Sequence, residues 1–358
     1  MVKGGGDGIT SGNTPMAEDF TVINLTQIQT GVSGVSVTAV TITAKSGKTT
    51  GAISNIRYNG STTIPQNAGT YPITFDVSGA GEWNEASDLS AGTLTVIVPG
   101  SFNVSNAAEW AVALSLIGFG GDGTSEVRKA YTINITDSFG IKGTTTNIFF
   151  SRTYIDVTIN GNNNTISLND GTGWTTLSTG SLFFIGDNQA VTMVSLTLKG
   201  HARNTAPLVN INGTNAAFTM NSGAVTGNKG GGVCLFSGGI FTMNGGEISG
   251  NSGTFIGGGV YGANGRFTMN GGTISGNTAR TWGGGVYVGG IFRISSGTVY
   301  GRNEGGNSNT AGSSAAALFN SNGEAQYGTF DAGGNWTSNG NLKTRNTTIK
   351  VVNGEIVQ

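Results

Sequence analysis

The chain of 358 residues contains 63 glycines, only 10% of its residues are charged, and its formal net charge is −1. This balance argues against a nucleic-acid-binding protein, which needs a basic face to neutralise phosphates, and against charge-driven attachment to a membrane surface. Apolar residues make up 36%, and no apolar run reaches the about 18 residues that indicate a membrane span. We therefore expect a folded β protein whose surface is rich in serine, threonine and asparagine.

Cysteine and histidine are too scarce for several kinds of chemistry. Cys234 and His201 are the single residues of their types. One cysteine cannot form a disulfide within the chain, and one histidine cannot supply a multi-histidine metal site. We predict no metal and no cofactor.

Residues 1–18 are rich in glycine, serine and asparagine, and we expect them to form a flexible leader. The segment lacks the apolar core of a signal peptide, so we expect neither a signal peptide nor a lipid anchor within this sequence. The first predicted strand follows at residue 20.

Residues 19–98 predict a small β-sandwich. Two of its strands alternate apolar and polar residues, as half-buried antiparallel strands do. Proline cannot donate to a strand ladder, so Pro72 predicts an edge strand or a bulge. Several short strands with turn residues between them are typical of a sandwich. The expected strands are 20–25, 35–43, 53–58, 70–77 and 92–98.

Pro99-Gly100 marks a boundary, after which residues 105–117 predict a helix. Asn106 followed by Glu109 fits a capping box. A short amphipathic helix at this place is suited to cover the first exposed turn of a repeat array. Its apolar face consists of Trp110, Leu114 and Ile117.

The region 218–303 repeats one pattern. F-x-M-N-x-G-x-(V/I)-x-G-N occurs at 218–228, 241–251 and 267–277, and a degenerate copy starts at Phe292. The copies begin 23, 26 and 25 residues apart, and a Gly-Gly-Gly-Val element follows each of the first three. Such a period indicates a leucine-rich repeat or a β-solenoid, and the leucine skeleton of the former is absent.

Each period is expected to hold three short strands and to form one coil, with coils stacked about 4.8 Å apart. Phe267, Met269 and Ile274 then point inward, and equivalent residues of successive coils form columns. Asparagines at the turns are expected to form amide ladders. The two ladders are Asn221, Asn244 and Asn270, and Asn228, Asn251 and Asn277.

Looser strand patterns extend the array in both directions, to about eight coils in all. Ala-Ala-Ala-Leu at 315–318 stands where Gly-Gly-Gly-Val would be. The turn signal Asn353-Gly354 lies in a segment, 340–358, that we expect to cap the far end. Upstream strands are expected at 131–136, 154–161, 181–186, 191–200 and 208–213.

Two stretches resemble known families. Ala68-Gly69-Thr70-Tyr71, Trp83-Asn84 and the strand that follows resemble the small immunoglobulin-like modules of bacterial surface proteins. Residues 106–358 resemble right-handed parallel β-helix proteins. The sequence motif GTISGNTA…GGGVYV is similar to motifs in repeat-rich cell-surface proteins of host-associated spirochaetes and gut bacteria, and in chlamydial autotransporter passengers. The resemblance implies an all-β protein, with an immunoglobulin-like β-sandwich at 19–98 and a right-handed parallel β-helix at 99–358. It also implies an extracellular or outer-cell-surface location.

The carboxylates give little support for catalysis. Parallel β-helix lyases and glycosidases need clustered acidic residues. Between Phe218 and Asn303 the single carboxylate is Glu247, which we expect to be solvated. We predict no catalytic residue, although acidic residues on loops could still converge. The upstream candidates are Asp156, Asp170 and Asp187.

Aromatic residues form the strongest candidate site. Tyr261 and Tyr287 should stack on the outer face of adjacent coils, and Phe255 and Trp282 precede the glycine triplets in equivalent loops. Arg280 lies two residues before Trp282. Aromatic rings beside a charge suit sugar rings or a protein partner. The alternative is that these rings only cover the glycine corner.

Three other features favour structure over chemistry. No Lys-Ser/Thr pair follows the glycine triplets, so they are not phosphate-binding loops. Cys234 shares the column of Tyr261 and Tyr287, and we expect it to face outward, partly exposed. An outward threonine column, broken by Arg293, is poor evidence for ice binding. Its members are Thr219, Thr242 and Thr268.

Together these features predict a non-catalytic bacterial cell-surface or secreted protein, monomeric, that serves adhesion by binding a glycan or a host or cell-surface protein. They predict no nucleic-acid partner and no membrane span. Two alternatives stay open at this point. One is a polysaccharide lyase or glycoside hydrolase with loop-borne carboxylates, and the other is a purely structural surface spacer.

Overall fold

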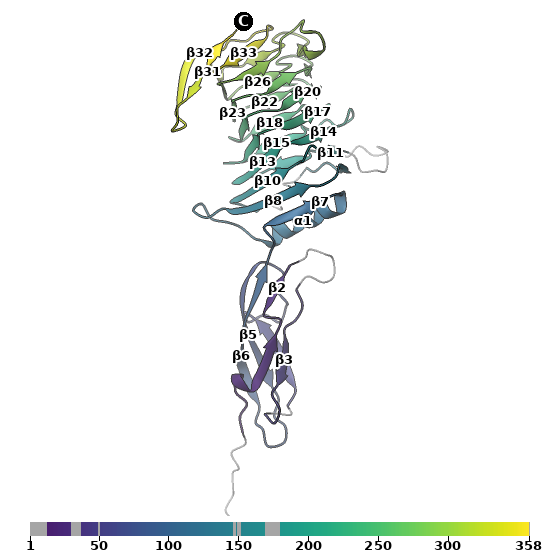
Figure 1. The fold of residues 1–358 in the computed structure, drawn as a ribbon, viewed down its shortest axis with the longest axis vertical. Coiled ribbons are helices and arrows are strands. Elements are labelled where there is room, and N and C mark those ends of the chain that lie inside the picture. Colours follow the sequence, from purple (N-terminus) through teal and green to yellow (C-terminus); the bar gives the residue numbers. More distant parts are fainter. Residues whose placement is uncertain are drawn as a thin grey trace, which may run out of the picture. The chain divides into compact units, whose positions relative to one another are not determined.

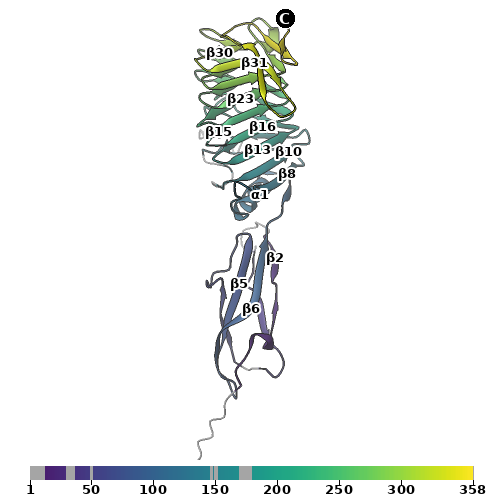
Figure 2. The same ribbon diagram turned by 90° about the vertical axis from the view of Figure 1, so that its left-hand side faces the viewer.

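The computed structural model shows a mostly β fold, with one α-helix in the part of the chain that it describes. The chain divides into two compact units, residues 1–99 with 119–121 and residues 100–118 with 122–358 (Figures 1 and 2). None of the described helices is long and apolar enough to cross a membrane. The described residues are 13–29, 37–48, 51–145, 148, 152–168 and 180–357.

The N-terminal unit is a small curled β region with a four-stranded sheet, in the order β2-β6-β5-β4, and an antiparallel pair of β1 and β3. Both sheets supply residues to one apolar core, in which the ring of Phe20 lies edge-on to that of Phe75 at 4.9 Å. Ile73, Phe75 and Leu94 are fully buried. The elements are η1 (Ala17–Asp19), β1 (Phe20–Ile23), β2 (Thr26–Ile28), β3 (Thr41–Ala44), β4 (Ile53–Tyr58), β5 (Gly69–Val77) and β6 (Ala86–Ile97).

Pro72 lies in an interior strand, because β5 is flanked by both β6 and β4. The register against β6 shifts between Pro72 and Thr74, so the predicted bulge is present and the predicted edge position is wrong. On its other side, the pairing with β4 ends at Ile73. The proline therefore needs no amide of its own at this point of the ladder.

The ends of the predicted N-terminal segments fall partly outside the described residues. Residues 1–12 of the expected leader lie outside them, while Asn13 accepts a hydrogen bond from the Asn84 amide at 2.8 Å. The expected strand 35–43 is described only from residue 37. Strand β6 begins at Ala86, earlier than residue 92, where alternation becomes visible in the sequence.

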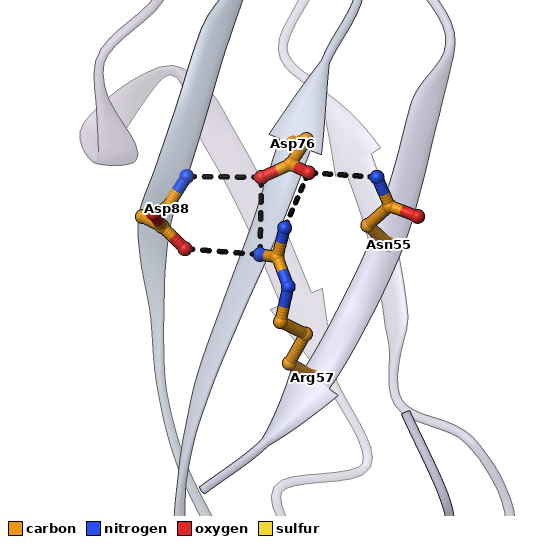
Figure 3. A network of polar contacts seen from close by, with 4 residues as sticks. All are labelled: Asn55, Arg57, Asp76 and Asp88. Carbon is orange, nitrogen blue, oxygen red and sulfur yellow. Dashed lines mark hydrogen bonds and ion pairs between the residues drawn. The ribbon is translucent and has the colours of Figure 1, made fainter. Parts of the chain in front are cut away.

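A polar network ties the three strands β4, β5 and β6 together (Figure 3). The Arg57 guanidinium lies 2.5 Å from a carboxylate oxygen of Asp76 and 3.0 Å from one of Asp88. Asp76 also accepts hydrogen bonds from the Asn55 side chain and from the Asp88 amide, at 2.8 and 3.0 Å. These donors, the Arg57 guanidinium first, lower the pKa of Asp76 to about 2.

The C-terminal unit is a parallel β-solenoid over residues 101–299 with about seven turns. Three long parallel sheets form its sides, and the chain passes from one sheet to the next within each turn. The first sheet contains β7 (Ser101–Val104), β8 (Lys129–Ile135), β10 (Ile155–Asn160), β13 (Gln189–Val194), β16 (Ala217–Met220), β19 (Ile240–Met243), β23 (Arg266–Met269), β27 (Ile291–Ile294), β31 (Glu324–Phe330) and β32 (Trp336–Asn341).

The other two long sheets run beside it. The second contains β9 (Phe139–Ile141), β11 (Thr165–Leu168), β14 (Leu196–Lys199), β17 (Gly223–Thr226), β20 (Glu247–Ser249), β24 (Thr273–Ser275), β28 (Gly297–Val299), β33 (Ile349–Val352) and β34 (Glu355–Ile356). The third contains β12 (Phe183–Ile185), β15 (Val209–Asn212), β18 (Val233–Phe236), β22 (Val260–Gly262), β26 (Val286–Val288) and β30 (Leu318–Asn320).

The structure corrects two details of the predicted coil. There are about seven turns rather than eight. The predicted strand 191–200 is two strands, β13 and β14, which belong to two different sheets. In addition, the loops before the last two glycine triplets and before Ala-Ala-Ala-Leu contain a fourth, short strand. These strands, β21 (Ser252–Gly253), β25 (Thr278–Ala279) and β29 (Thr310–Ala311), form a three-stranded sheet of their own.

The core consists of stacked columns. The register places Phe218, Phe241, Phe267 and Phe292 one above another, with ring centroids 5.5, 4.8 and 4.9 Å apart. A methionine column lies two residues further along the same strands. All these side chains are essentially buried, so the formation of the core explains why apolar residues recur at these positions of the repeat.

The two ends of the solenoid are closed differently. Helix α1 (Ala107–Phe119) begins with Asn106, whose side-chain oxygen accepts from two backbone amides, and Glu109 reaches back to the Ser105 amide instead of that of Asn106. Its buried Trp110 packs against Phe139 in β9 and Phe183 in β12, with ring centroids 6.3 and 6.1 Å away, and so covers this end of the solenoid. At the other end, β32, β33 and β34 pair antiparallel, and the β33–β34 turn is Asn353-Gly354.

Candidate functional site: an aromatic ridge on the solenoid

The third sheet carries an outward column of residues, one from each turn. Register places Asn210, Cys234, Tyr261, Tyr287 and Phe319 at equivalent positions of consecutive strands. In a strand, alternate side chains point to opposite faces, so these residues face away from the buried valine column. The last three positions are aromatic.

These rings form a continuous stack that we call the aromatic ridge, made of Phe236, Tyr261, Tyr287, Phe319 and Trp282. Tyr261 and Tyr287 lie 5.3 Å apart, and Phe319 continues the stack 5.4 Å from Tyr287. Phe236 meets Tyr261 edge-on at 5.6 Å, and Trp282 stacks on Phe319 at 5.1 Å with an interplanar angle of 17°. Trp282 is 39% exposed, so the end of the ridge is accessible to a ligand.

Phe255 and Arg280 form a second cluster beside the ridge. The Arg280 guanidinium lies 5.4 Å from the centroid of the Phe255 ring, a cation–π contact, and Phe255 is 62% exposed. The loops that hold them are tied together, because Thr281 donates both its amide and its hydroxyl to the Phe255 carbonyl, at 2.8 and 2.7 Å. Ile256 also forms a β-bridge with Trp282, which places the cluster next to the ridge.

An open depression of about 450 Å³ lies at this second cluster. Its wall includes the cations Lys229 and Arg280, and no carboxylate is among its lining residues. No ion pair between described residues includes either cation. The depression can therefore offer positive charge and hydroxyl groups to a ligand. Its remaining lining residues are Thr205, Ser252, Gly253, Thr254, Phe255 and Thr278.

The five predicted ligand-binding residues thus divide into two adjacent groups. Tyr261, Tyr287 and Trp282 belong to the ridge, whereas Phe255 and Arg280 line the depression. Trp282 stacks on a ring that the sequence reasoning missed, and that ring stacks in turn on Tyr287.

That missed residue is Phe319. The signal is present in the sequence, because Ala-Ala-Ala-Leu at 315–318 aligns with Gly-Gly-Gly-Val, and the next residue then aligns with Tyr287. The structure shows this register, with Leu318 opposite Val286 and Phe319 opposite Tyr287. Phe236 gave no such signal, since it lies two residues beyond the shared column.

The hydroxyl of Tyr261 is affected by its partial burial. Burial raises the pKa of Tyr261, and the neighbouring Tyr287 and Cys234 add to the effect. Tyr261 is therefore neutral at ordinary pH, and its hydroxyl is available as a hydrogen-bond donor or acceptor.

Cys234 lies in the outward column as predicted, but the expectation of partial exposure is wrong. It is only 7% exposed, and burial raises its pKa to about 12. Its short side chain stands between the longer side chains of Asn210 and Tyr261 at the adjacent positions of the column. The thiol is thus a poor nucleophile.

The asparagines form two ladders with different surroundings. In the exposed ladder, Asn270 donates to Asn244 and Asn244 donates to Asn221, at 2.9 and 2.8 Å. In the buried ladder, Asn251 and Asn277 each donate to the next amide oxygen at 3.1 Å. The complete buried series is Asn204, Asn228, Asn251, Asn277 and Asn309.

The buried ladder also binds backbone groups of neighbouring coils. The Asn277 side chain donates to the Ile248 carbonyl at 2.8 Å, and its amide N–H donates to Asn309 at 2.8 Å. In the degenerate repeat, Asn309 occupies the ladder position, whereas Asn303 is exposed with φ of 69°. The intervening segment forms the short 3₁₀ helix η2 (Gly305–Asn307), which loops out of the coil.

The glycine triplets are corners of the solenoid. A Cβ atom on Gly259 would lie 2.6 Å from the backbone oxygen of Gly285 in the next coil, a distance that real side chains do not reach. Gly283 has a φ of 66°, which favours glycine. Close packing of coils explains these residues without a bound phosphate.

The acidic residues that were weighed as catalytic candidates make structural contacts. Asp156 pairs with Arg128 at 2.7 Å, and Asp187 accepts from the Thr214 amide at 2.6 Å. Glu247 is exposed and accepts from the Ser275 hydroxyl. Asp170 lies outside the described residues. Among the described residues, no group of three His, Cys, Asp or Glu side chains could hold a metal ion.

No protein-family model matches this sequence, and neither a curated protein nor a solved structure matches it.

Proposed function

We propose that this chain is a non-catalytic bacterial cell-surface or secreted protein that binds a glycan through the aromatic ridge and thereby serves adhesion. One observation carries the proposal. Five rings contact one another in series on the outer face of the third sheet and its adjoining loop, while the inner face of that sheet is buried in the core. The same outward column also holds Asn210 and Cys234, so the coil does not need a ring at every position of this column.

The chemistry of the ridge suits sugar rings. Aromatic side chains present a large, rigid apolar face, and tyrosine adds a polar edge that can hydrogen-bond. The depression beside the ridge supplies Lys229, Arg280 and several hydroxyl groups. A few polar groups beside an apolar platform are typical of small-molecule binding sites.

The proposal includes two finer features of the fold. The N-terminal unit would be an immunoglobulin-like sandwich, which is supported by its two sheets around one core. The solenoid would be right-handed, which is supported by the strong preference of parallel crossovers for that hand. A surface location rests on the resemblance of the repeats to those of bacterial surface proteins.

The enzyme alternative has weaker support. A glycosidase needs two carboxyl groups about 5 to 10 Å apart across a bound sugar. Asp156 and Asp187 are instead engaged with Arg128 and with a turn amide. The glycan-binding proposal needs no such pair.

A glycan array tests the proposal. The wild-type protein should give a signal with a defined group of glycans, and the Trp282→Ala, Tyr287→Ala double variant should lose at least about tenfold of that signal, because ring anchors dominate binding energy. Thr219→Ala with Thr242→Ala is a matched control, since these half-buried residues face outward on another sheet.

Circular dichroism should show that both double variants stay folded. No wild-type signal on the array would favour the spacer alternative and reject glycan binding. A signal unchanged by loss of Trp282 and Tyr287 would reject the ridge as the binding site.

A further inference from the structure

The far end of the solenoid contains a second cleft, of about 380 Å³, that the ridge does not touch. Four segments form it: the turn after β23, the turn after β27, the end of β31, and the β33–β34 turn. The β31–β32 hairpin projects beside the last turns of the solenoid, near the C-terminus (Figure 1). Its lining residues are Asn270, Ser295, Ser296, Thr329, Phe330, Asn353 and Gly354.

The hairpin provides an aromatic wall because β31 is longer than the strand before it. Residues Glu324–Tyr327 pair with β27, but Gly328–Phe330 pair only with β32 and extend past the sheet. The Phe330 ring, which lines the cleft, lies 4.8 Å from that of Trp336.

Trp336 in turn is held by one side chain of β31 and one of β27. Its indole N–H donates to the Gln326 side chain at 2.8 Å, and the Arg293 guanidinium lies 5.5 Å from its ring centroid. Arg293 also pairs with Glu324 at 3.1 Å. The wall is therefore held in place by contacts outside the cleft, so a ligand would not need to order it.

The opposite side of the cleft is a fixed polar surface. Ser295 donates its hydroxyl to Asn270 at 2.9 Å, and the Gly354 amide donates to the Ser295 carbonyl at 2.7 Å. The Asn353 amide N–H donates to the Ser296 hydroxyl oxygen at 3.0 Å. These bonds position the turn that carries Asn353.

Two polar groups that line the cleft keep unused hydrogen-bonding capacity. Within the described part of the chain, neither the Thr329 hydroxyl nor the Asn353 side-chain amide has a hydrogen-bond partner, while both residues line the cleft. An amide offers two donors and an acceptor, and a hydroxyl offers one donor and two acceptor lone pairs. No charged side chain is among the lining residues.

We propose that this cleft is a second carbohydrate site, specific for a neutral sugar unit and independent of the aromatic ridge. The Phe330 ring covers one apolar face of the pyranose. The Asn353 amide and the Thr329 hydroxyl bind its hydroxyl groups. The absence of charge in the lining distinguishes this cleft from the cationic depression at Lys229 and Arg280, where an acidic sugar would gain more.

Isothermal titration of the full chain tests the proposal. The probes are neutral hexasaccharides of β-1,4-glucose, α-1,4-glucose and β-1,4-mannose, with an oligogalacturonate of equal length as the charged counterpart. At least one neutral probe should bind more tightly than the oligogalacturonate to the cleft. Phe330→Ala should weaken its binding by roughly tenfold or more, as loss of an aromatic anchor does.

Two milder variants keep the test decisive if Phe330→Ala fails to fold. Thr329→Val removes a hydroxyl at nearly constant shape, and Asn353→Gly removes the amide while it suits the φ of 49° at this turn. Each should weaken binding by about threefold to tenfold. Thr219→Val, the same change four strands away on the same sheet, should leave the affinity unchanged.

Three outcomes would overturn the proposal. They are no binding of any neutral probe to the folded protein, binding that all the cleft variants leave intact, and binding that is lost in the Trp282→Ala, Tyr287→Ala variant but kept in the cleft variants. The last outcome would assign the neutral sugar to the ridge and leave glycan binding itself in place.

Discussion

The solenoid stacks aromatic rings on both sides of its wall, and the two stacks have different relations to the fold. The inward column of Phe218, Phe241, Phe267 and Phe292 has centroid spacings of 4.8 to 5.5 Å. The outward rings of Tyr261, Tyr287 and Phe319 repeat almost the same spacing, at 5.3 and 5.4 Å. Coil geometry therefore sets the spacing in both, whatever the rings do.

Burial separates the two stacks. The inward rings are at most 2% exposed, and the hydrophobic effect is a sufficient reason for them. The outward rings are half-buried and stand in a column that also holds an asparagine and a cysteine. A position that accepts such different side chains is not under the same packing requirement, so its aromatic members are the better candidates for binding.

The largest expected difference is between a core ring and a ridge ring. Phe241→Ala should lower the free energy of unfolding by about 3 to 5 kcal/mol, because it leaves a cavity between two stacked neighbours. Tyr287→Ala should cost about 1 to 2 kcal/mol, from its lost ring contacts. Urea denaturation followed by circular dichroism measures both free energies. Equal losses of stability in the two variants would contradict the view that the core rings stabilise the fold more than the ridge rings do.

The two asparagine ladders allow the same comparison for polar groups. Asn251→Ala should destabilise the solenoid by about 1 to 3 kcal/mol, since buried donors and acceptors lose their partners. Asn244→Ala, in the exposed ladder, should change stability by less than about 0.5 kcal/mol because water replaces the lost bonds. The same denaturation series compares them. A larger loss for Asn244→Ala would mean that the exposed ladder is a structural element in its own right.

Sequence reasoning predicted the coil well where copies repeat and less well where they diverge. The Phe, Met and Asn positions of the regular repeats could be placed because a fixed register stacks equivalent residues of successive coils into columns. The number of turns was overestimated, and Asn309 was missed, because an insertion moves the ladder residue away from its expected spacing. The burial of Cys234 could not be predicted from the alternation of apolar and polar residues. Alternation shows which face of the sheet a side chain lies on, but not how far the neighbouring side chains cover it.

The candidate sites show the same limit. The ridge was foreseen in part because its tyrosines follow the repeat. The cleft at Phe330 and Asn353 was not foreseen, because most of its residues lie outside the three regular copies, and the antiparallel pairings of β31 with β32 and of β28 with β33 bring them together. Periodicity predicts contacts between equivalent residues, whereas such a site depends on contacts between unlike segments.

The smallest expected change in stability concerns the polar network of the N-terminal sheet. Here the half-buried carboxylate of Asp76 is compared with the exposed carboxylate of Asp88. The pKa of Asp76 is lowered to about 2, chiefly by the Arg57 guanidinium, so the folded state favours the ionised carboxylate. Its contribution to stability is fully present above the ordinary carboxyl pKa of about 3.9 and is lost as the pH falls toward the folded value. The stability difference between wild type and Asp76→Asn should therefore be greatest near pH 6 and should shrink between pH 4 and pH 2.

Hydrogen–deuterium exchange of the amides in β4, β5 and β6 localises this measurement to the N-terminal unit. Asp88→Asn is the matched control, because the Asp88 side chain is 74% exposed and makes one contact with the same guanidinium. Asp88→Asn should lower the free energy of unfolding by less than Asp76→Asn does, since exposed ion pairs contribute little to stability. A difference between wild type and Asp76→Asn that stays constant from pH 6 to pH 2 would show that Asp76 acts by shape alone. A difference that shrinks with acid would show that its charge holds the three strands together, in contrast to the solenoid, whose columns depend on burial.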